Sequence, residues 1–104
     1  MQEILDTITQ WESIGRSIAL ATVVKAYGSA PRPLGSKMVI NDVGEFSGSV
    51  SGGCVEGAVI EEALAVIKNG QPNLLQFGIT DDLAFNIGLA CGGNIEVFIE
   101  PLDI

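Results

Sequence analysis

The chain has 104 residues and a mass of 10.9 kDa, which suits one domain with one hydrophobic core and leaves no room for a second. Its 47% hydrophobic and 17% charged residues are typical of a globular protein and argue against disorder. Thirteen acids against five bases give a net charge of −8, which disfavours binding to nucleic acid or to an anionic membrane. Histidine is absent, so imidazole bases, imidazole metal ligands and Ser-His or Cys-His pairs are excluded.

The start of the chain carries acids where a secretory signal peptide has positive charge. No apolar run approaches the roughly 20 residues that a membrane-spanning helix needs. We therefore expect a cytoplasmic protein. In that reducing compartment Cys54 and Cys91 are expected to be free or reactive thiols rather than partners in a disulfide.

The N-terminal part of the chain predicts a helix, a strand and a loop. Apolar residues recur at helical spacing over residues 2–14, which predicts an amphipathic helix with Trp11 in the core and Gly15 as its stop. Residues 18–24 are nearly all apolar and partly β-branched, which indicates a strand covered on both faces. The prolines and glycines of residues 27–36 predict a fixed loop.

The middle of the chain predicts a hairpin and a second helix. Residues 38–40 and 45–50 are expected to pair across a tight turn. Residues 55–69 predict a helix that Gly70 ends, with two adjacent apolar rows on one side and charged residues on the other. The rows are Ile60, Leu64 and Ile67, and Val59, Ala63 and Val66.

The C-terminal part predicts two strands, at residues 74–77 and 95–100, the second stopped by Pro101. Residues 81–88 are ambiguous between a helical turn and a loop. The order helix, strand, hairpin, helix, strand, strand predicts an α/β domain, with α+β as the alternative. We expect a mixed sheet of about five strands packed with two main helices.

Four of the five bases lie in the acid-free stretch between Glu12 and Asp42, namely Arg16, Lys25, Arg32 and Lys37. A small anion would be bound in such a stretch, although a chance run of solvated side chains gives the same pattern. The prolines on both sides of Arg32 restrain the backbone, which lowers the entropy cost of presenting its guanidinium to a phosphate. Lys37 follows a few residues later.

Glycines gather where the hairpin leads into the second predicted helix, at Gly44, Gly48, Gly52, Gly53 and Gly57. A strand-to-helix junction of this kind directs free N–H groups and the positive end of the helix dipole at one spot, and Ser47, Ser49 and Ser51 add hydroxyl donors. This pattern predicts an anion site, although no P-loop or dinucleotide motif is present. Glycines that only permit a sharp turn are the alternative.

Cys54 lies at the expected start of the second helix, where a helix N-terminus stabilises a thiolate and lowers the pKa of the thiol. A thiolate suits a soft metal or sulfur chemistry better than Mg or Ca. Cys91 precedes Gly92 and Gly93 just before the last strand, so the two thiols are candidates for one cleft. The alternative is that both cysteines are small buried hydrophobes, and two thiols fall short of a closed zinc site.

Four segments of the chain form a specific set of motifs: GSAPRPLGSKM at 28–38, GSVSGGCVEG at 48–57, LACGG at 89–93 and EVFIEP at 96–101. Together they resemble the N-terminal domain of the XdhC/CoxI family, accessory proteins that mature molybdenum hydroxylases such as xanthine dehydrogenase and aerobic CO dehydrogenase. The segments fall in the family's order and cover most of the chain.

The resemblance implies binding of the molybdenum cofactor, in which the dithiolene of a phosphorylated pyranopterin holds the metal. Cys54 matches the family's functional cysteine and would be the metal ligand, with Cys91 as a second candidate. The remaining cofactor-binding candidates are Ser51, Gly52, Gly53, Arg32, Lys37, Gly92 and Gly93. Family members usually continue into a Rossmann-like domain, so residues 1–104 are expected to be the N-terminal domain without that partner.

The resulting hypothesis is a non-catalytic carrier that protects the cofactor and delivers it to an apo molybdenum hydroxylase. The alternatives are a small thiol enzyme that carries persulfide sulfur on Cys54, and an interaction module that pairs with a separate Rossmann-like subunit. The lack of a histidine base ranks the enzyme below the carrier. A sulfurtransferase is a further candidate partner, and a mean hydropathy of +0.41 is consistent with a homo-oligomer.

Overall fold

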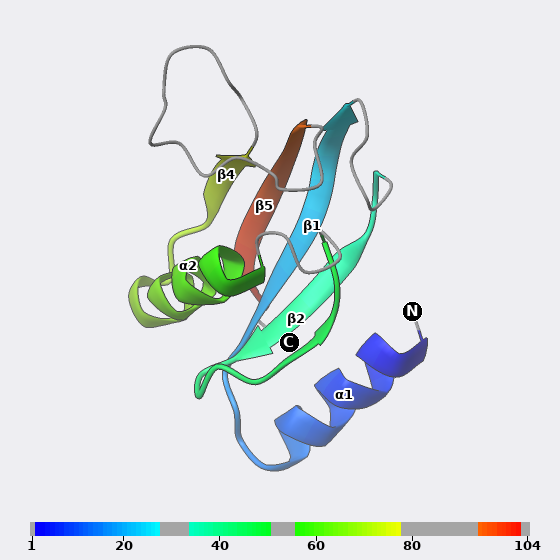
Figure 1. Ribbon diagram of the computed structural model, residues 1–104. Helices are drawn as coiled ribbons and strands as arrows, with labels where there is room; N and C mark the ends of the chain where they lie inside the picture. Colours follow the sequence, from blue (N-terminus) through cyan, green and yellow to red (C-terminus); the bar gives the residue numbers. More distant parts are fainter. Residues whose placement is uncertain (1, 28–33, 51–55, 78–93, 103–104) are drawn as a thin grey trace.

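The computed structural model describes residues 2–27, 34–50, 56–77 and 94–102. Figure 1 shows one β-sheet with helices packed on it. Across the sheet the strand order is β3-β2-β1-β5-β4. The elements in chain order are α1 (Gln2–Ser13), β1 (Ile18–Tyr27), β2 (Lys37–Asn41), β3 (Phe46–Gly48), α2 (Glu56–Asn69), β4 (Asn73–Phe77) and β5 (Asn94–Leu102).

The two helices pack on opposite faces of the sheet, because side chains alternate between faces along each strand. In β1, Ala19, Ala21 and Val23 belong to the core cluster under α2. Ile18 packs instead with α1 and with Val39 of β2. The expected burial of β1 on both faces is thus confirmed at its start, whereas Val24 further along is 39% exposed.

Each helix follows the predicted pattern and ends where a glycine permits it. In α1, Ile4 and Trp11 are buried, and the turn at Gly15 (φ 79°) lets the Arg16 amide donate to the Trp11 carbonyl at 3.0 Å. The Gly15 amide donates to the Glu12 carbonyl at 3.1 Å, which completes a Schellman cap. In the described part of the chain, neither helix is long and apolar enough to cross a membrane.

Helix α2 buries one of its two predicted apolar rows completely and the other only in part. Val59, Ala63 and Val66 are between 0% and 1% exposed, so this row faces the sheet. Ile60 and Ile67 are partly buried, and Leu64 is 37% exposed. The helix therefore lies with its Val59 row on β1, β2 and β5.

The expected architecture of five strands and two helices is confirmed, and all pairings between neighbouring described strands are antiparallel rather than mixed. A strand-helix-strand order suggests a parallel pair only when the helix returns the chain to a neighbouring strand. Here α2 leads from β3 at one edge of the sheet to β4 at the other edge. The α+β alternative therefore describes the sheet best.

Two strand boundaries differ from the sequence-based expectation. Pro101 does not stop β5. It pairs with Ala19 of β1 and lies beyond the first residue of β4, which pairs with Ile99, so its missing N–H interrupts no pairing with β4. The expected strand at 45–50 is shortened to β3, because Gly48 adopts a φ of 86° that turns the chain out of the strand. Residues 81–88 lie outside the described residues.

One end of the sheet collects the flanks of three segments. Tyr27 at the end of β1 pairs with Asn94 at the start of β5, and Phe77 at the end of β4 pairs with Ile95. The start of β2 lies toward the same end, because Lys37 pairs with Thr22 in the second half of β1, and the end of β3 lies beside it, because Met38 pairs with Gly48. This end of the sheet positions the candidate site.

Candidate functional site

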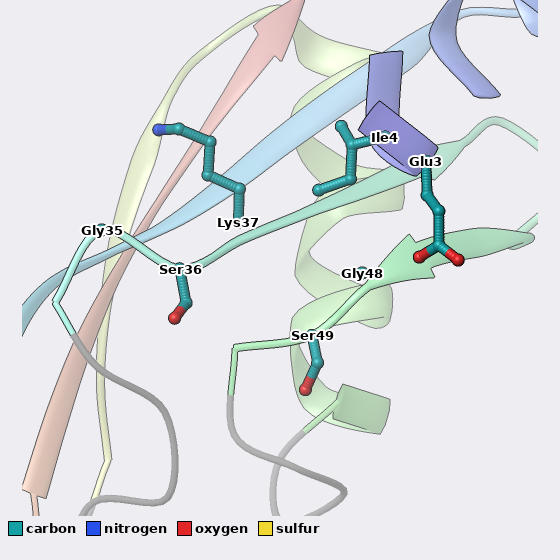
Figure 2. Close-up of a pocket in the computed structure, with 7 residues that line it drawn as sticks. All are labelled: Glu3, Ile4, Gly35, Ser36, Lys37, Gly48 and Ser49. Atoms are coloured by element: carbon teal, nitrogen blue, oxygen red, sulfur yellow. The ribbon is translucent and has the colours of Figure 1, made fainter. Parts of the chain in front are cut away.

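A pocket of about 520 Å³ lies where β2 begins and β3 ends, which is a volume typical of small-molecule sites. Its lining includes Gly35, Ser36 and Lys37 from the first glycine-containing motif and Gly48 and Ser49 from the second. Glu3 and Ile4 of α1 also line it (Figure 2). The fold thus brings two motifs that are separate in the sequence to one concave surface.

The polar groups of the pocket point in two directions. Figure 2 shows the side chains of Glu3, Ser36 and Ser49 directed to one side, while Lys37 extends the other way. The Lys37 Nζ donates to Thr22 Oγ1 of β1 at 3.4 Å. Within the described residues the one ion pair joins Arg16 to Asp42 at 3.6 Å, so no acid there neutralises Lys37.

Gly48 lies so close to β2 and α1 that there is no room for a side chain at this position. A Cβ at this position would stand 2.5 Å from the Lys37 carbonyl oxygen and 2.9 Å from Ile4 Cδ1. Its φ of 86° is also unfavourable for residues with a side chain. The absence of a side chain at Gly48 therefore allows α1, β2 and β3 to pack closely along the pocket wall.

Ser49 is held from two sides. Its amide donates to the Lys37 carbonyl of β2 at 3.1 Å, and its Oγ donates to Glu56 Oε2 at 2.7 Å. The Val50 amide donates to the same carboxylate oxygen at 3.3 Å. Glu56 is the first residue of α2, so these contacts tie the end of β3 to the start of that helix.

Most of the predicted site residues lie outside the described residues. They are Arg32, Ser51, Gly52, Gly53, Cys54, Cys91, Gly92 and Gly93. Lys37 is described, and it lies at the pocket. A cleft shared by the two thiols stays a prediction. Among the described residues, no three acidic or thiol side chains are grouped to hold a metal ion.

Three features in or beside the pocket escaped the sequence-based prediction. Glu56 bonds to residues six and seven positions earlier, a spacing with no recognised motif. Glu3 and Ile4 reach the pocket because α1 packs against β2 and β3, which is a tertiary contact. For Ser36, the one sequence signal of a role in the pocket was its position inside the motif at residues 28–38.

Comparison with known proteins finds relatives named for molybdenum cofactor insertion and for xanthine dehydrogenase. It is 40% identical over 88 residues to the molybdenum cofactor insertion chaperone PaoD of Escherichia coli, covering 85% of this chain and 27% of that protein. It is 36% identical over 85 residues to a Bacillus subtilis protein named as a probable component of xanthine dehydrogenase, covering 80% of this chain and 26% of that protein.

The fold also matches a solved structure described as a xanthine dehydrogenase from Bacillus halodurans. The TM-score is 0.76 at 27% identity, and the match covers 96% of this chain and 30% of the other. The chain thus spans under a third of the length of these relatives. Residues 11–78 match the XdhC and CoxI family, and the chain belongs to that family.

Proposed function

We propose that this chain binds the molybdenum cofactor as cargo and passes it to a molybdenum hydroxylase. Membership of the XdhC and CoxI family supports this role, as does its similarity to a protein named a molybdenum cofactor insertion chaperone. The similarity to proteins named for xanthine dehydrogenase supports a hydroxylase of that type as the recipient.

The observation that carries the proposal is the pocket between β2 and β3. It joins residues of both glycine-containing motifs and holds the Ser36 hydroxyl, with the Lys37 ammonium nearby; the Ser49 hydroxyl already donates to Glu56. Hydroxyl and ammonium donors are suited to a phosphate. Ser36 and Lys37 therefore support binding of the phosphorylated end of the cofactor at this pocket.

The metal end of the cofactor requires a softer ligand than the described pocket holds. We assign that role to Cys54, which follows Ser49 and Val50 by a few residues and precedes Glu56. Ser51, Gly52, Gly53 and Arg32 would add donors for the phosphate, and Cys91, Gly92 and Gly93 would contribute from the segment before β5. These roles are proposals for residues outside the described part.

The first test measures cargo directly. The chain would be produced in cells that synthesise the cofactor and purified without oxygen, and its molybdenum and its oxidised fluorescent pterin would be quantified per mole of protein. We expect the wild-type chain to carry both, and Cys54→Ser to lose nearly all of them. The exposed Glu61→Gln is the control and should match the wild type. A wild-type chain without pterin would refute the proposal.

The charged residues of the pocket predict whether a substitution raises or lowers the pterin content. Lys37→Gln removes a cation beside the pocket and should lower pterin content, whereas Glu3→Gln removes an acid that repels phosphate and should raise it. The expected changes are about twofold to tenfold, because both side chains are partly or fully exposed to solvent. Equal effects of the two variants would show that the bound group is not anionic.

Delivery needs a separate assay. The loaded chain would be mixed with an apo molybdenum hydroxylase of the xanthine dehydrogenase type, and hydroxylase activity would be followed over time. We expect activity to appear with the wild-type chain and not with Cys54→Ser prepared in the same way. Full cargo without any transfer would refute delivery while leaving cofactor binding intact.

A further inference from the structure

Glu96 of β5 is a buried acid whose carboxylate has no partner among the described residues. It is 8% exposed, and within residues 2–27, 34–50, 56–77 and 94–102 neither a hydrogen bond nor an ion pair holds its side chain. By contrast, the buried Asn41 accepts from the Val43 and Glu45 amides at 3.0 Å and donates to Glu45 Oε1 at 2.8 Å. Burying a carboxylate without a partner opposes folding, so packing alone does not explain Glu96.

The Glu96 side chain points to the sheet face opposite α2. Ile95 and Val97 belong to the core cluster under α2, and side chains alternate between faces along a strand. The cross-strand partners of Glu96 share its face, and both are exposed: Lys25 of β1 and Gln76 of β4. Helix α1 packs on this face mainly against β2 and β3. The β5 side of the face is therefore available to another molecule.

The same face carries a cation and an aromatic ring between the pocket and Glu96. Lys37, Thr22 and Phe98 form one row across β2, β1 and β5. The Lys37 Nζ donates to Thr22 Oγ1 at 3.4 Å, so the ammonium extends away from Ser36 and toward β1 (Figure 2). From the spacing of strands and residues, Glu96 lies about 10 Å across the sheet from Lys37 and about 7 Å along it.

We propose that Glu96 recognises the pterin end of the cofactor, with its carboxylate accepting from the amino group and from the adjacent ring N–H. These two donors lie side by side on a pterin, which suits a bidentate contact with the two carboxylate oxygens. The phosphate is at the other end of the pyranopterin, beside Ser36 and Lys37 in the pocket. Phe98 gives the fused rings between the two ends an apolar surface.

This inference rests on the proposed function, since it assigns the second end of the same ligand. It also gives a reason for the unpartnered carboxylate. A site that must bind two N–H donors keeps its acceptors free, and the domain loses stability in exchange for recognition. Removing the charge should therefore weaken binding without weakening the fold, which a structural role would not do.

The first test compares Glu96→Gln with Glu100→Gln, which makes the same change on the same strand and the same face. We expect Glu96→Gln to lower pterin content by about tenfold or more, because an amide directs donors at a donor edge. Its thermal midpoint without cargo should equal or exceed that of the wild type. Glu100→Gln should stay within about threefold in pterin content. A lower midpoint for Glu96→Gln with unchanged pterin would overturn the proposal.

The conservative variant Glu96→Asp supplies a rescue. It keeps both carboxylate oxygens and retracts them by one methylene group, so its pterin content should lie between those of the wild type and Glu96→Gln. Equal losses in Glu96→Asp and Glu96→Gln would overturn recognition by the carboxylate.

A second test uses the wild-type chain without cargo and does not depend on the folding of a variant. Free pterin and lumazine, which has an oxygen in place of the amino group, would be titrated by fluorescence anisotropy. We expect pterin to bind about tenfold more tightly, because the lumazine oxygen would face the carboxylate. Equal affinities, or no measurable binding of pterin, would overturn the role of Glu96.

The two tests separate this inference from the proposed function. A wild-type chain that is purified without pterin yet prefers pterin to lumazine would refute cofactor carriage and support recognition by Glu96. A wild-type chain that carries cargo but binds both probes equally would overturn the role of Glu96 alone.

Discussion

At the scale of single residues, the pocket depends on positions that allow close approach. Gly48 combines a positive φ with a position where a Cβ would clash with the Lys37 carbonyl and with Ile4, whereas Gly15 has a similar φ and open space where a Cβ would stand. A substitution at Gly15 therefore measures the cost of backbone strain alone, whereas the same substitution at Gly48 adds the cost of a steric clash.

We expect Gly48→Ala to destabilise the protein by about 2 to 4 kcal/mol, because backbone strain of about 1 to 2 kcal/mol adds to a clash with a carbonyl that cannot move freely. Gly15→Ala should cost about 1 to 2 kcal/mol, from strain alone. Urea unfolding monitored by Trp11 fluorescence measures both. A Gly48→Ala variant no less stable than Gly15→Ala would contradict the close approach.

Residue types alone could not reveal the two-sided anchoring of Ser49. Trp11 and Gly15 were predicted correctly because helical periodicity and a glycine stop are local signals. The contact between Ser49 and Glu56 joins residues seven positions apart across a strand end and a helix start. No periodic pattern encodes such a contact, so it became visible only with the fold.

At the scale of elements, α2 is attached to the sheet by one row of small residues. Val59, Ala63 and Val66 are fully buried, while Leu64 on the neighbouring row remains 37% exposed. The sequence predicted both rows but could not rank them, because both are apolar and adjacent on the helix. The direction of the helix across the sheet decides which row is buried.

Truncating the two rows should have unequal effects. Val59→Ala should cost about 2 kcal/mol, the loss of two buried methyl groups with a cavity left behind. Leu64→Ala removes a larger side chain yet should cost less than about 1 kcal/mol, since much of it already contacts water. Chemical denaturation of the two variants under one set of conditions compares them. A larger effect for Leu64→Ala would mean that α2 is rotated about its axis.

At the scale of the whole molecule, the protein has a net charge of −8 on 104 residues. Self-repulsion of this size opposes the folded state, and added salt screens it.

The sequence predicted the number of strands and helices, but not the antiparallel order. That order depends on where α2 delivers the chain, which is a property of packing between distant segments.

We expect the thermal midpoint to rise by a few degrees when NaCl is increased from about 20 mM to about 300 mM, because the Debye length falls well below the size of the domain. Scanning calorimetry at pH 7 measures the shift, and sucrose at equal osmolality is the control for non-ionic effects. A midpoint that falls with salt would show that attractive ion pairs outweigh the repulsion.

The pairing of β1 with β5 has a consequence for how the protein is made. These two strands come from residues 18–27 and 94–102, so their pairing joins segments that are far apart in the sequence. Such a topology has a high contact order, which slows folding. A nascent chain can pair β1 with β2 early, but β1 lacks β5 on its other edge until residues 94–102 have emerged, and that edge is exposed to chaperones and to aggregation for that time.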